Sequence, residues 1–229
     1  MTNTKWRHED KYILNAGQVL ILKSRLAGLM RPDINSNADG SYRVRSVYFD
    51  SADNTCYREI ENGTDPREKF RIRIYNADTS RITLELKRKQ RGRVNKVSCP
   101  ISEDMCRRLI KGEILKLGPD EPELLKKFVR LMRSQLYRPV VIVEYTRVPL
   151  VYGISNTRVT FDLDLAASRY VEHFLDDTIP RRLVMPAGQH VMEIKWDEFL
   201  PDHIKQSLQT ECLNINTFSK YLQCRRISL

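Results

Sequence analysis

Two arginines that stand two positions apart are the first feature of this sequence that could do chemistry. Arg71 and Arg73 alternate with three apolar residues, Phe70, Ile72 and Ile74. In a β-strand, residues at positions i and i+2 project from the same face, roughly 7 Å apart. Arginine binds phosphate oxygens with two parallel hydrogen bonds, whereas lysine acts as a mobile point charge. The spacing therefore predicts side chains that bind neighbouring phosphoryl groups.

The same alternation recurs in three further segments. Their charged faces are Glu85-Lys87-Lys89, Arg158-Thr160-Asp162 and Glu193-Lys195, each opposed by apolar neighbours. For any one strand, an ordinary sheet with its charged face in water explains the pattern equally well. Across four strands the pattern favours a shared site, because arginine and lysine recur with only isolated acidic residues.

The elements that must position these residues are mostly strands. The predicted strands are 5–14, 42–50, 69–75, 81–89, 93–100, 139–148, 157–163, 168–174 and 191–196, with 55–61 as a further short one. Helices are predicted at 16–30 with Asn15 and Gln18 as a capping pair, from Ser102 to Gly112, after Asp120 and Glu123, near 201–208, and from about Asn216.

About eight strands in 229 residues predict an α+β fold, a closed antiparallel eight-stranded β-barrel with flanking amphipathic helices, as one domain over residues 1–229. Closure removes exposed strand edges, and a barrel of about eight strands encloses side chains or one small ligand. If the helices cover the outside, the charged faces point inward. Buried cations then need carboxylates, water or an anionic ligand, which predicts a polyphosphate site.

Composition sets limits on the class of protein. There are 39 Lys and Arg against 29 Asp and Glu, a net charge of +10, which suggests an anionic partner or a well-solvated basic surface. Five cysteines without CxxC spacing argue against a disulfide framework and a zinc site, and the scattered histidines argue against a histidine metal site.

The sequence also carries signals of compartment and partner. No apolar run approaches the roughly 18 residues of a membrane span, and residues 1–15 lack the apolar core of a signal peptide. A soluble cytoplasmic protein is expected, which could still contact a membrane protein. No phosphate-binding loop of the GxxxxGK[ST] type is present. Aromatic residues do not interleave with the basic ones, so no nucleic-acid partner is expected.

Eight short segments together resemble the polyphosphate polymerase (VTC) domain, a branch of the triphosphate tunnel metalloenzymes. They occur in the family's order over nearly the whole chain: Arg7–Tyr12, Arg45–Asp50, Lys69–Arg73, Leu84–Lys87, Val143–Arg147, Arg158–Asp162, Met192–Asp197 and Phe218–Tyr221. The resemblance implies an antiparallel tunnel open at both ends. It also implies transfer of the γ-phosphate of ATP to a growing polyphosphate chain, assisted by Mn²⁺ or Mg²⁺.

The resemblance also implies roles for individual residues. The phosphate- and nucleotide-binding cations would be Lys11, Arg71, Arg73, Lys87, Lys96, Arg147, Arg158 and Lys220. Glu193 would hold the metal, with Glu9, Glu85 and Asp162 as helpers or ion-pair partners. Arg71, Arg73, Ser219 and Lys220 would act in catalysis, the last two near the tunnel mouth. If Asn216 caps the last helix, Ser219 lies in its first turn, where free N–H groups attract anions.

The sequence is compatible with three functions. The first is the ATP-dependent polymerase, and the second is a hydrolase of triphosphates or polyphosphate on the same tunnel. The third is a barrel that binds polyphosphate or another polyanion without turnover. Glu193 argues against the third, because an anion binder has little use for a carboxylate among arginines. Only the resemblance favours the polymerase over the hydrolase. The oligomeric state is left open.

Overall fold

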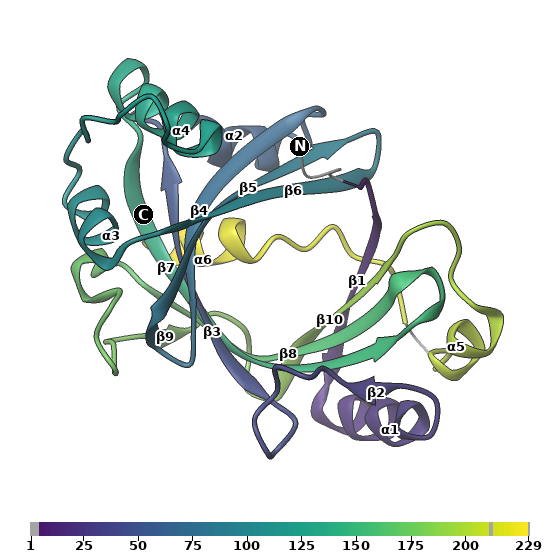
Figure 1. The fold of residues 1–229 in the computed structure, drawn as a ribbon. Helices are drawn as coiled ribbons and strands as arrows, with labels where there is room; N and C mark the ends of the chain where they lie inside the picture. The colour runs from purple at the N-terminus through teal and green to yellow at the C-terminus, as the bar shows by residue number, and fades with distance from the viewer. Residues whose placement is uncertain (1–4, 211–212, 229) are drawn as a thin grey trace.

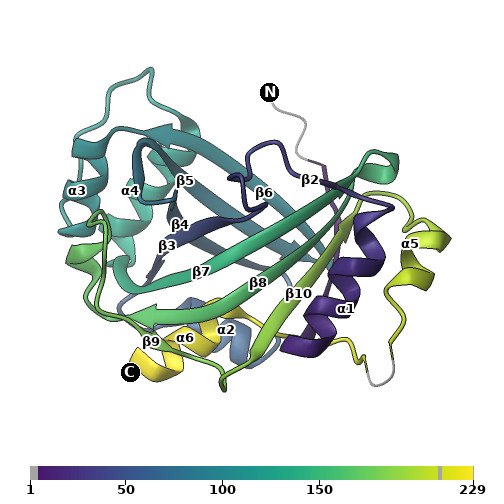
Figure 2. The ribbon, with the colours of Figure 1, turned by 90° about the horizontal axis from the view of Figure 1, so that it is seen from below.

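Long antiparallel strands form one sheet that curls on itself (Figures 1 and 2). The computed structural model describes residues 5–210 and 213–228. The strands that make up the curl are β1 (His8–Asn15), β3 (Tyr42–Asp50), β4 (Arg67–Tyr75), β5 (Asp78–Gln90), β6 (Arg93–Ile101), β7 (Arg138–Tyr152), β8 (Thr157–Ser168) and β10 (Gln189–Trp196). Two short strands, β2 (Arg31–Pro32) and β9 (Arg182–Leu183), pair with β7 and β8.

The order of strands across the sheet is β1-β10-β8-β7-β3-β4-β5-β6, so β1 and β6 are its two edges. Among the described residues, the two edges are joined by one backbone bridge, between Arg7 just before β1 and Val94 of β6, where both N–H···O distances are 2.9 Å. The eight antiparallel strands are as predicted, but the barrel is a curled half-barrel and not a continuously closed one. Beyond the bridge, residues of both edges line a pocket of about 270 Å³.

Helices cover the outer face of the curl on two sides. The helices are α1 (Ala16–Ala27), α2 (Thr55–Glu61), α3 (Glu103–Ile110), α4 (Glu123–Ser134), α5 (Asp202–Ser207) and α6 (Lys220–Ser228). Helices α3 and α4 pack over the β4–β6 side, and α1 and α5 lie outside β10 (Figure 2). Phe128 of α4 contacts the rings of Phe49 and Phe70, and all three side chains are buried.

The outward residues of the alternating strands form these apolar layers. Ile72, Ile74 and Leu84 are fully buried in the core under α3 and α4, and Phe161 and Met192 are buried in the core under α1. Because the side chains of a strand alternate between faces, the charged neighbours of these residues must project inward. The charged faces are therefore enclosed, and the alternative of a sheet with its charged face in water does not apply.

Several predicted elements differ from the observed ones. Residues 55–61 form the helix α2 rather than a strand, because the carboxylate of Asp50 accepts hydrogen bonds from the N–H groups of Cys56 and Tyr57. Strand β8 runs on to Ser168 through a register shift, and a 3₁₀ turn over Val171–His173 replaces the strand predicted at 168–174.

The helix ends differ as well. Asn15 and Gln18 form the predicted capping box, and Ser102 caps α3. Helix α1 ends at Ala27, before the predicted residue 30, and α4 has Pro122 at its N-cap instead of a side chain that caps it. The last helix begins at Lys220 and not near Asn216. In the described part of the chain, no helix combines the length and apolar character needed to cross a bilayer.

Candidate functional site

A small cavity inside the curled sheet is lined almost entirely by charged side chains. Its volume is about 50 Å³, and its lining contains eight cationic residues, one carboxylate and two tyrosines. The lining residues are Lys11, Tyr48, Lys69, Arg71, Arg73, Lys87, Tyr145, Arg147, Glu193, Lys195 and Lys220. They come from strands on all sides of the curl and from α6, so residues far apart in the sequence converge here. We call this the central cavity.

One side of the central cavity is a cluster of two acids and two cations. The Nζ atom of Lys220 lies 2.5 Å from Glu193 and 2.6 Å from Asp162. Arg147 forms two hydrogen bonds to Asp162, at 2.6 and 2.8 Å, and lies 3.6 Å from Glu193. Burial opposes charge on Lys220, but Asp162 and Glu193 outweigh it and raise the pKa of Lys220. Lys220 is therefore a fixed positive charge, suited to neutralising phosphate and not to accepting a proton.

The opposite wall of the central cavity carries the two arginines of β4. Arg71 contacts Glu85 at 2.6 Å, and Arg73 hydrogen bonds to the hydroxyls of Ser46 and Tyr145. Burial would raise the pKa of Glu85, but Arg71 and Arg73 dominate and lower it, so this carboxylate is ionised. Because Glu85 holds the guanidinium groups from one side, their remaining N–H donors are oriented in advance for an anion.

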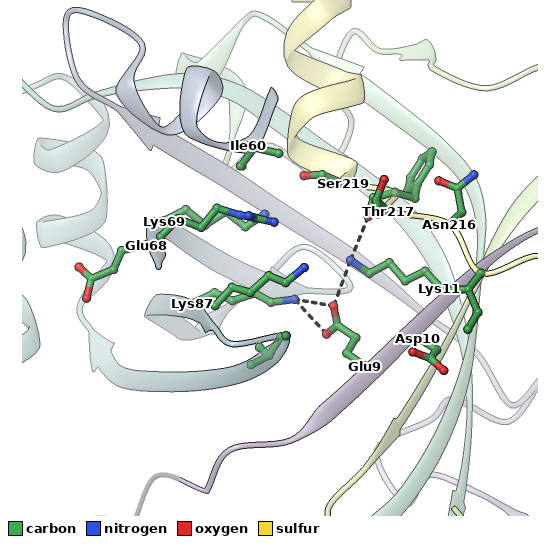
Figure 3. A pocket seen from close by; sticks show the side chains of 16 residues that line it. Glu9, Asp10, Lys11, Ile60, Glu68, Lys69, Lys87, Asn216, Thr217 and Ser219 are labelled. Carbon is green, nitrogen blue, oxygen red and sulfur yellow. Dashed lines mark hydrogen bonds and ion pairs between the residues drawn. The ribbon is translucent and has the colours of Figure 1, made fainter. Parts of the chain in front are cut away.

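A wider pocket, which we call the near pocket, opens from the central cavity at the seam between β1 and β6 (Figure 3). Its volume is about 270 Å³, and it shares Lys11, Lys69 and Lys87 with the central cavity. Glu9 lies between two of these lysines, 2.8 Å from Lys87 and 3.0 Å from Lys11. Burial, together with the charges of Lys11 and Lys195, lowers the pKa of Lys87 to about 7, although Glu9 opposes this shift.

Lys69 is a cavity residue that we did not single out from the sequence. It lines both the central cavity and the near pocket, with its ammonium group 5.7 Å from the ring centre of Tyr48 and 5.9 Å from that of Tyr221. Burial lowers the pKa of Lys69 well below its ordinary value, and the charges of Lys87 and Lys11 lower it further. Among the described residues, it is the cavity cation without an ion pair to a carboxylate.

The signal that could have identified Lys69 was present in the sequence. It precedes Arg71 by two positions, so the same alternation places it on the inward face. Lys195 was also missed as a site residue, although the same alternation indicates it, because it follows Glu193 by two positions. The structure places its ammonium group 2.8 Å from that carboxylate.

Helix α6 brings Lys220 into the cavity, and it is held by a buried hydrogen bond. The hydroxyl of Tyr221 donates to Asp50 at 2.5 Å, and the same carboxylate caps α2. The segment before α6 is attached to β1, because Lys11 donates to the carbonyl of Phe218 and accepts from the N–H of Asn216. In Figure 1 this segment and α6 cross the middle of the curled sheet.

Three of the predicted site residues lie outside the central cavity. Lys96 is half-exposed on the edge strand β6 and contacts Glu85 at 2.8 Å. Arg158 lines a separate pocket at the other end of the sheet. Ser219 lines the near pocket and precedes α6 instead of lying in its first turn, with its hydroxyl 3.4 Å from the N–H of Leu222. The other predicted residues, Lys11, Arg71, Arg73, Lys87, Arg147, Glu193 and Lys220, are brought together.

The carboxylates of the site are potential ligands for a divalent cation. Among the described residues, no group of three or more His, Cys, Asp or Glu side chains is arranged to hold a metal ion. A cation that binds phosphate oxygens needs only one or two protein carboxylates, and hard oxygen ligands suit Mg²⁺ and Mn²⁺. Glu193 faces the cavity, and its cationic neighbours, Lys195 and Lys220 foremost, hold its pKa well below the ordinary value against the effect of burial. It fits the role of a single protein ligand.

The fold is similar to two solved structures. One, from Bacillus halodurans, is described as a candidate adenylate cyclase; it is 14% identical, with a TM-score of 0.54 over 91% of this chain and 88% of that chain. The other, from Hippeastrum, is a candidate adenylyl cyclase with a dominant triphosphatase activity. It is 13% identical, with a TM-score of 0.54 over 98% of this chain and 97% of that one. No curated protein sequence matches the chain.

A family model describes the sequence over nearly its full length. The VTC domain matches residues 6–229, which include all eight segments singled out from the sequence. The match also includes every residue of the central cavity. The chain therefore belongs to the VTC domain family.

Proposed function

We propose that this protein is an ATP-dependent polyphosphate polymerase. In this reaction an oxygen of the terminal phosphate of a polyphosphate chain forms a bond to the γ-phosphorus of ATP, the bond between that phosphorus and the β–γ bridging oxygen breaks, and ADP leaves. The observation that carries the proposal is the convergence of eight cations and Glu193 on the central cavity. The VTC family match supports a phosphate substrate.

In phosphoryl transfer the protein mainly positions the reacting groups and neutralises the charge on the phosphate oxygens. Arg71 and Arg73 are prepositioned by Glu85 and Tyr145 to bind neighbouring phosphoryl groups. Lys220 stays charged next to Glu193 and would neutralise charge as the γ-phosphoryl group transfers. Ser219, at the boundary between the near pocket and α6, would contact the phosphates that enter from that side.

Glu193 would hold a divalent cation, Mg²⁺ or Mn²⁺, together with phosphate oxygens. When bound, such an ion neutralises charge on the transferred group. Both oxygens of Glu193 contact ammonium groups, at 2.5 Å from Lys220 and 2.8 Å from Lys195. The phosphates of the substrate give these ammonium groups alternative partners, so we expect the metal and the phosphates to bind together.

A triphosphatase is the second candidate. The Hippeastrum protein, which has the same fold, is described as having a dominant triphosphatase activity. The two reactions differ only in the acceptor, which is water in one and a phosphate chain in the other. The resemblance of the eight sequence segments to the polyphosphate polymerase domain favours the polymerase.

The two reactions are separated by incubating the purified protein with γ-labelled ATP and Mn²⁺ and resolving the labelled products by size. The polymerase predicts label in long chains, together with ADP. Label released only as orthophosphate would favour the triphosphatase, and binding of polyphosphate without either product would favour a non-catalytic polyanion-binding barrel. The double variant Arg71→Ala, Arg73→Ala provides the control for activity that does not come from the central cavity.

A further inference from the structure

The inward residues of β4 run along a line of three cavities. Arg67 and Lys69, near its start, line the near pocket, and Arg71 and Arg73 line the central cavity. Tyr75, its last residue, lines a third pocket of about 310 Å³, which we call the far pocket. A strand rises by about 3.3 Å per residue, so the near and far pockets lie at opposite ends of the curled sheet.

The charge changes along this line. The near pocket and the central cavity contain an excess of lysine and arginine. The charged residues of the far pocket are two acids and two arginines, Asp33, Asp78, Arg81 and Arg158. A phosphate chain is therefore attracted to the near side, and it loses this excess of positive charge at the far pocket, where two carboxylates balance two arginines.

One ion pair occupies the boundary between the central cavity and the far pocket. The Nη2 atom of Arg158 lies 2.8 Å from a carboxylate oxygen of Asp33 and 2.8 Å from the hydroxyl of Tyr42. Burial opposes ionisation of Asp33, but hydrogen bonds from Asn35 and the charge of Arg158 lower its pKa. Asp33 is therefore a negative charge at neutral pH, on the loop between β2 and β3.

Two buried polar atoms beside this ion pair have no hydrogen-bond partner. They are the Nε of Arg158 and the hydroxyl oxygen of Thr160, which is 1% exposed, two positions further along β8. Buried polar groups are usually satisfied, and exceptions mark places where water or a ligand binds. Thr160 lies between Arg158, which lines the far pocket, and Asp162, which pairs with Arg147 of the central cavity, so these atoms lie between the two cavities on the inward face of β8.

We propose that Asp33 is a specificity-determining residue that limits how far a phosphate chain extends from the central cavity into the far pocket. A chain that passes this point must replace Asp33 as the partner of Arg158 and must approach a carboxylate of like charge. Short chains that fill only the near pocket and the central cavity do not meet Asp33. This inference rests on the proposed polyphosphate substrate, but it does not depend on whether the protein polymerises or hydrolyses it.

The test compares the affinity of two ligands, tripolyphosphate and long-chain polyphosphate, for the parent protein and for Asp33→Asn. Asparagine keeps the size of the side chain and the oxygen that accepts from Asn35. We expect about a fivefold gain in affinity for the long chain, the size of one partly exposed charge contact, and less than about a twofold change for tripolyphosphate. Asp33→Ser, which also suits the turn, should show the same difference between the two ligands.

Asp78→Asn is the matched control, because it removes one negative charge from the same pocket without touching Arg158. It should leave both affinities within about twofold of the parent values. The role of Asp33 would be overturned if Asp33→Asn changed the affinities for the short and the long chain equally. It would also be overturned if Asp33→Asn and Asp78→Asn changed the affinity for the long chain equally. A parent protein that binds neither ligand would overturn both this role and the proposed function. A parent that binds both with no length-dependent effect of Asp33→Asn would overturn this role alone.

Discussion

The ammonium group of Lys220 lies 2.5 Å from a carboxylate oxygen of Glu193, which ties the first residue of α6 to strand β10 inside the curled sheet. The two residues are separated by 27 positions in the sequence. Their contact holds both groups ionised, since each shifts the pKa of the other towards the charged form. The position of α6 therefore sets the electrostatics of the site, and the residues that hold α6 should affect turnover.

Tyr221→Phe should lower both stability and turnover. The change removes the hydroxyl that Tyr221 donates to the buried carboxylate of Asp50 while it keeps the ring. Loss of a buried hydrogen bond to a charged group should lower the free energy of unfolding by about 1–3 kcal/mol, measured in urea. Because α6 then loosens, kcat should fall more than KM changes. Tyr57→Phe, which loses an exposed hydrogen bond to Glu61, is the control. Equal effects of the two variants would contradict this role of Tyr221.

Arg71→Ala combined with Arg73→Ala should abolish tight binding of tripolyphosphate as well as turnover. Both guanidinium groups line the central cavity and are prepositioned there. Each charge-assisted hydrogen bond contributes about 1.5–3 kcal/mol, so the affinity should fall at least about a hundredfold, measured by calorimetry. Arg133→Ala, on the exposed side of α4, should bind as the parent does. Retained affinity in the double variant would place the binding site elsewhere.

Binding of tripolyphosphate should tighten as the pH falls from 9 towards 7. The pKa of Lys87 is about 7 in the unliganded protein, so this group is mostly neutral above that value. A bound anion raises its pKa, and binding therefore takes up a proton over the interval between the two values. Below about pH 7 the effect should level off. Lys87→Arg stays charged throughout and should show a flatter profile. The same slope in both proteins would remove Lys87 from the effect.

Lys87 also affects the stability of the unliganded protein. Its pKa is lowered from an ordinary value of 10.5 to about 7, so between these values the unfolded chain binds more protons at this position than the folded one. The contribution of Lys87 to the free energy of unfolding should therefore rise with pH over that interval. It should be constant below about pH 7. Urea unfolding of the parent and of Lys87→Arg, each at pH 7 and pH 9, measures this change in the free energy of unfolding.

Tripolyphosphate should also stabilise the folded protein. The central cavity places eight lysine and arginine side chains together, and a bound anion relieves the repulsion among those that are charged. At a ligand concentration of about 100 times the dissociation constant, the gain in the free energy of unfolding should be about 2.7 kcal/mol. The gain should shrink as salt is added. A melting temperature that does not change with tripolyphosphate at low salt would count against the site.

The face that each charged residue occupies could be predicted from the sequence, because strands alternate with a period of two. This rule correctly predicted that Arg71, Arg73 and Glu193 share an inward face, and all three line the central cavity. It fixes the face but not the depth along the axis of the sheet. Arg158 obeys the alternation, but it lies one cavity further along, next to Asp33. Its depth depends on the register between β8 and its neighbours, and alternation carries no signal for that register.

The elements that were predicted wrongly depend on contacts across the chain. Residues 55–61 form a helix because Asp50 caps them, and Asp50 is buried through its bond to Tyr221, 171 positions later. The start of α6 at Lys220 and not near Asn216 follows from attachment of Asn216 to β1, where its N–H group bonds to Lys11. Closure of the barrel also depends on a contact between distant parts of the chain, the bridge between Arg7 and Val94, which joins the two edges in the part of the chain that the structure describes.

The most direct test of the account is the rate of polymer formation from ATP by Glu193→Gln, measured alongside its affinity for labelled polyphosphate. Glutamine keeps the size of the side chain and removes the charge that would hold the metal. We expect a rate at least about a hundredfold lower than that of the parent, because one electrostatic contribution to the transition state is lost. Affinity should be kept or increased, because a negative charge leaves a cationic cavity. Asp164→Asn, at an exposed acid on the same sheet, should match the parent in both measurements. A Glu193→Gln protein that polymerises at the parental rate would contradict the account.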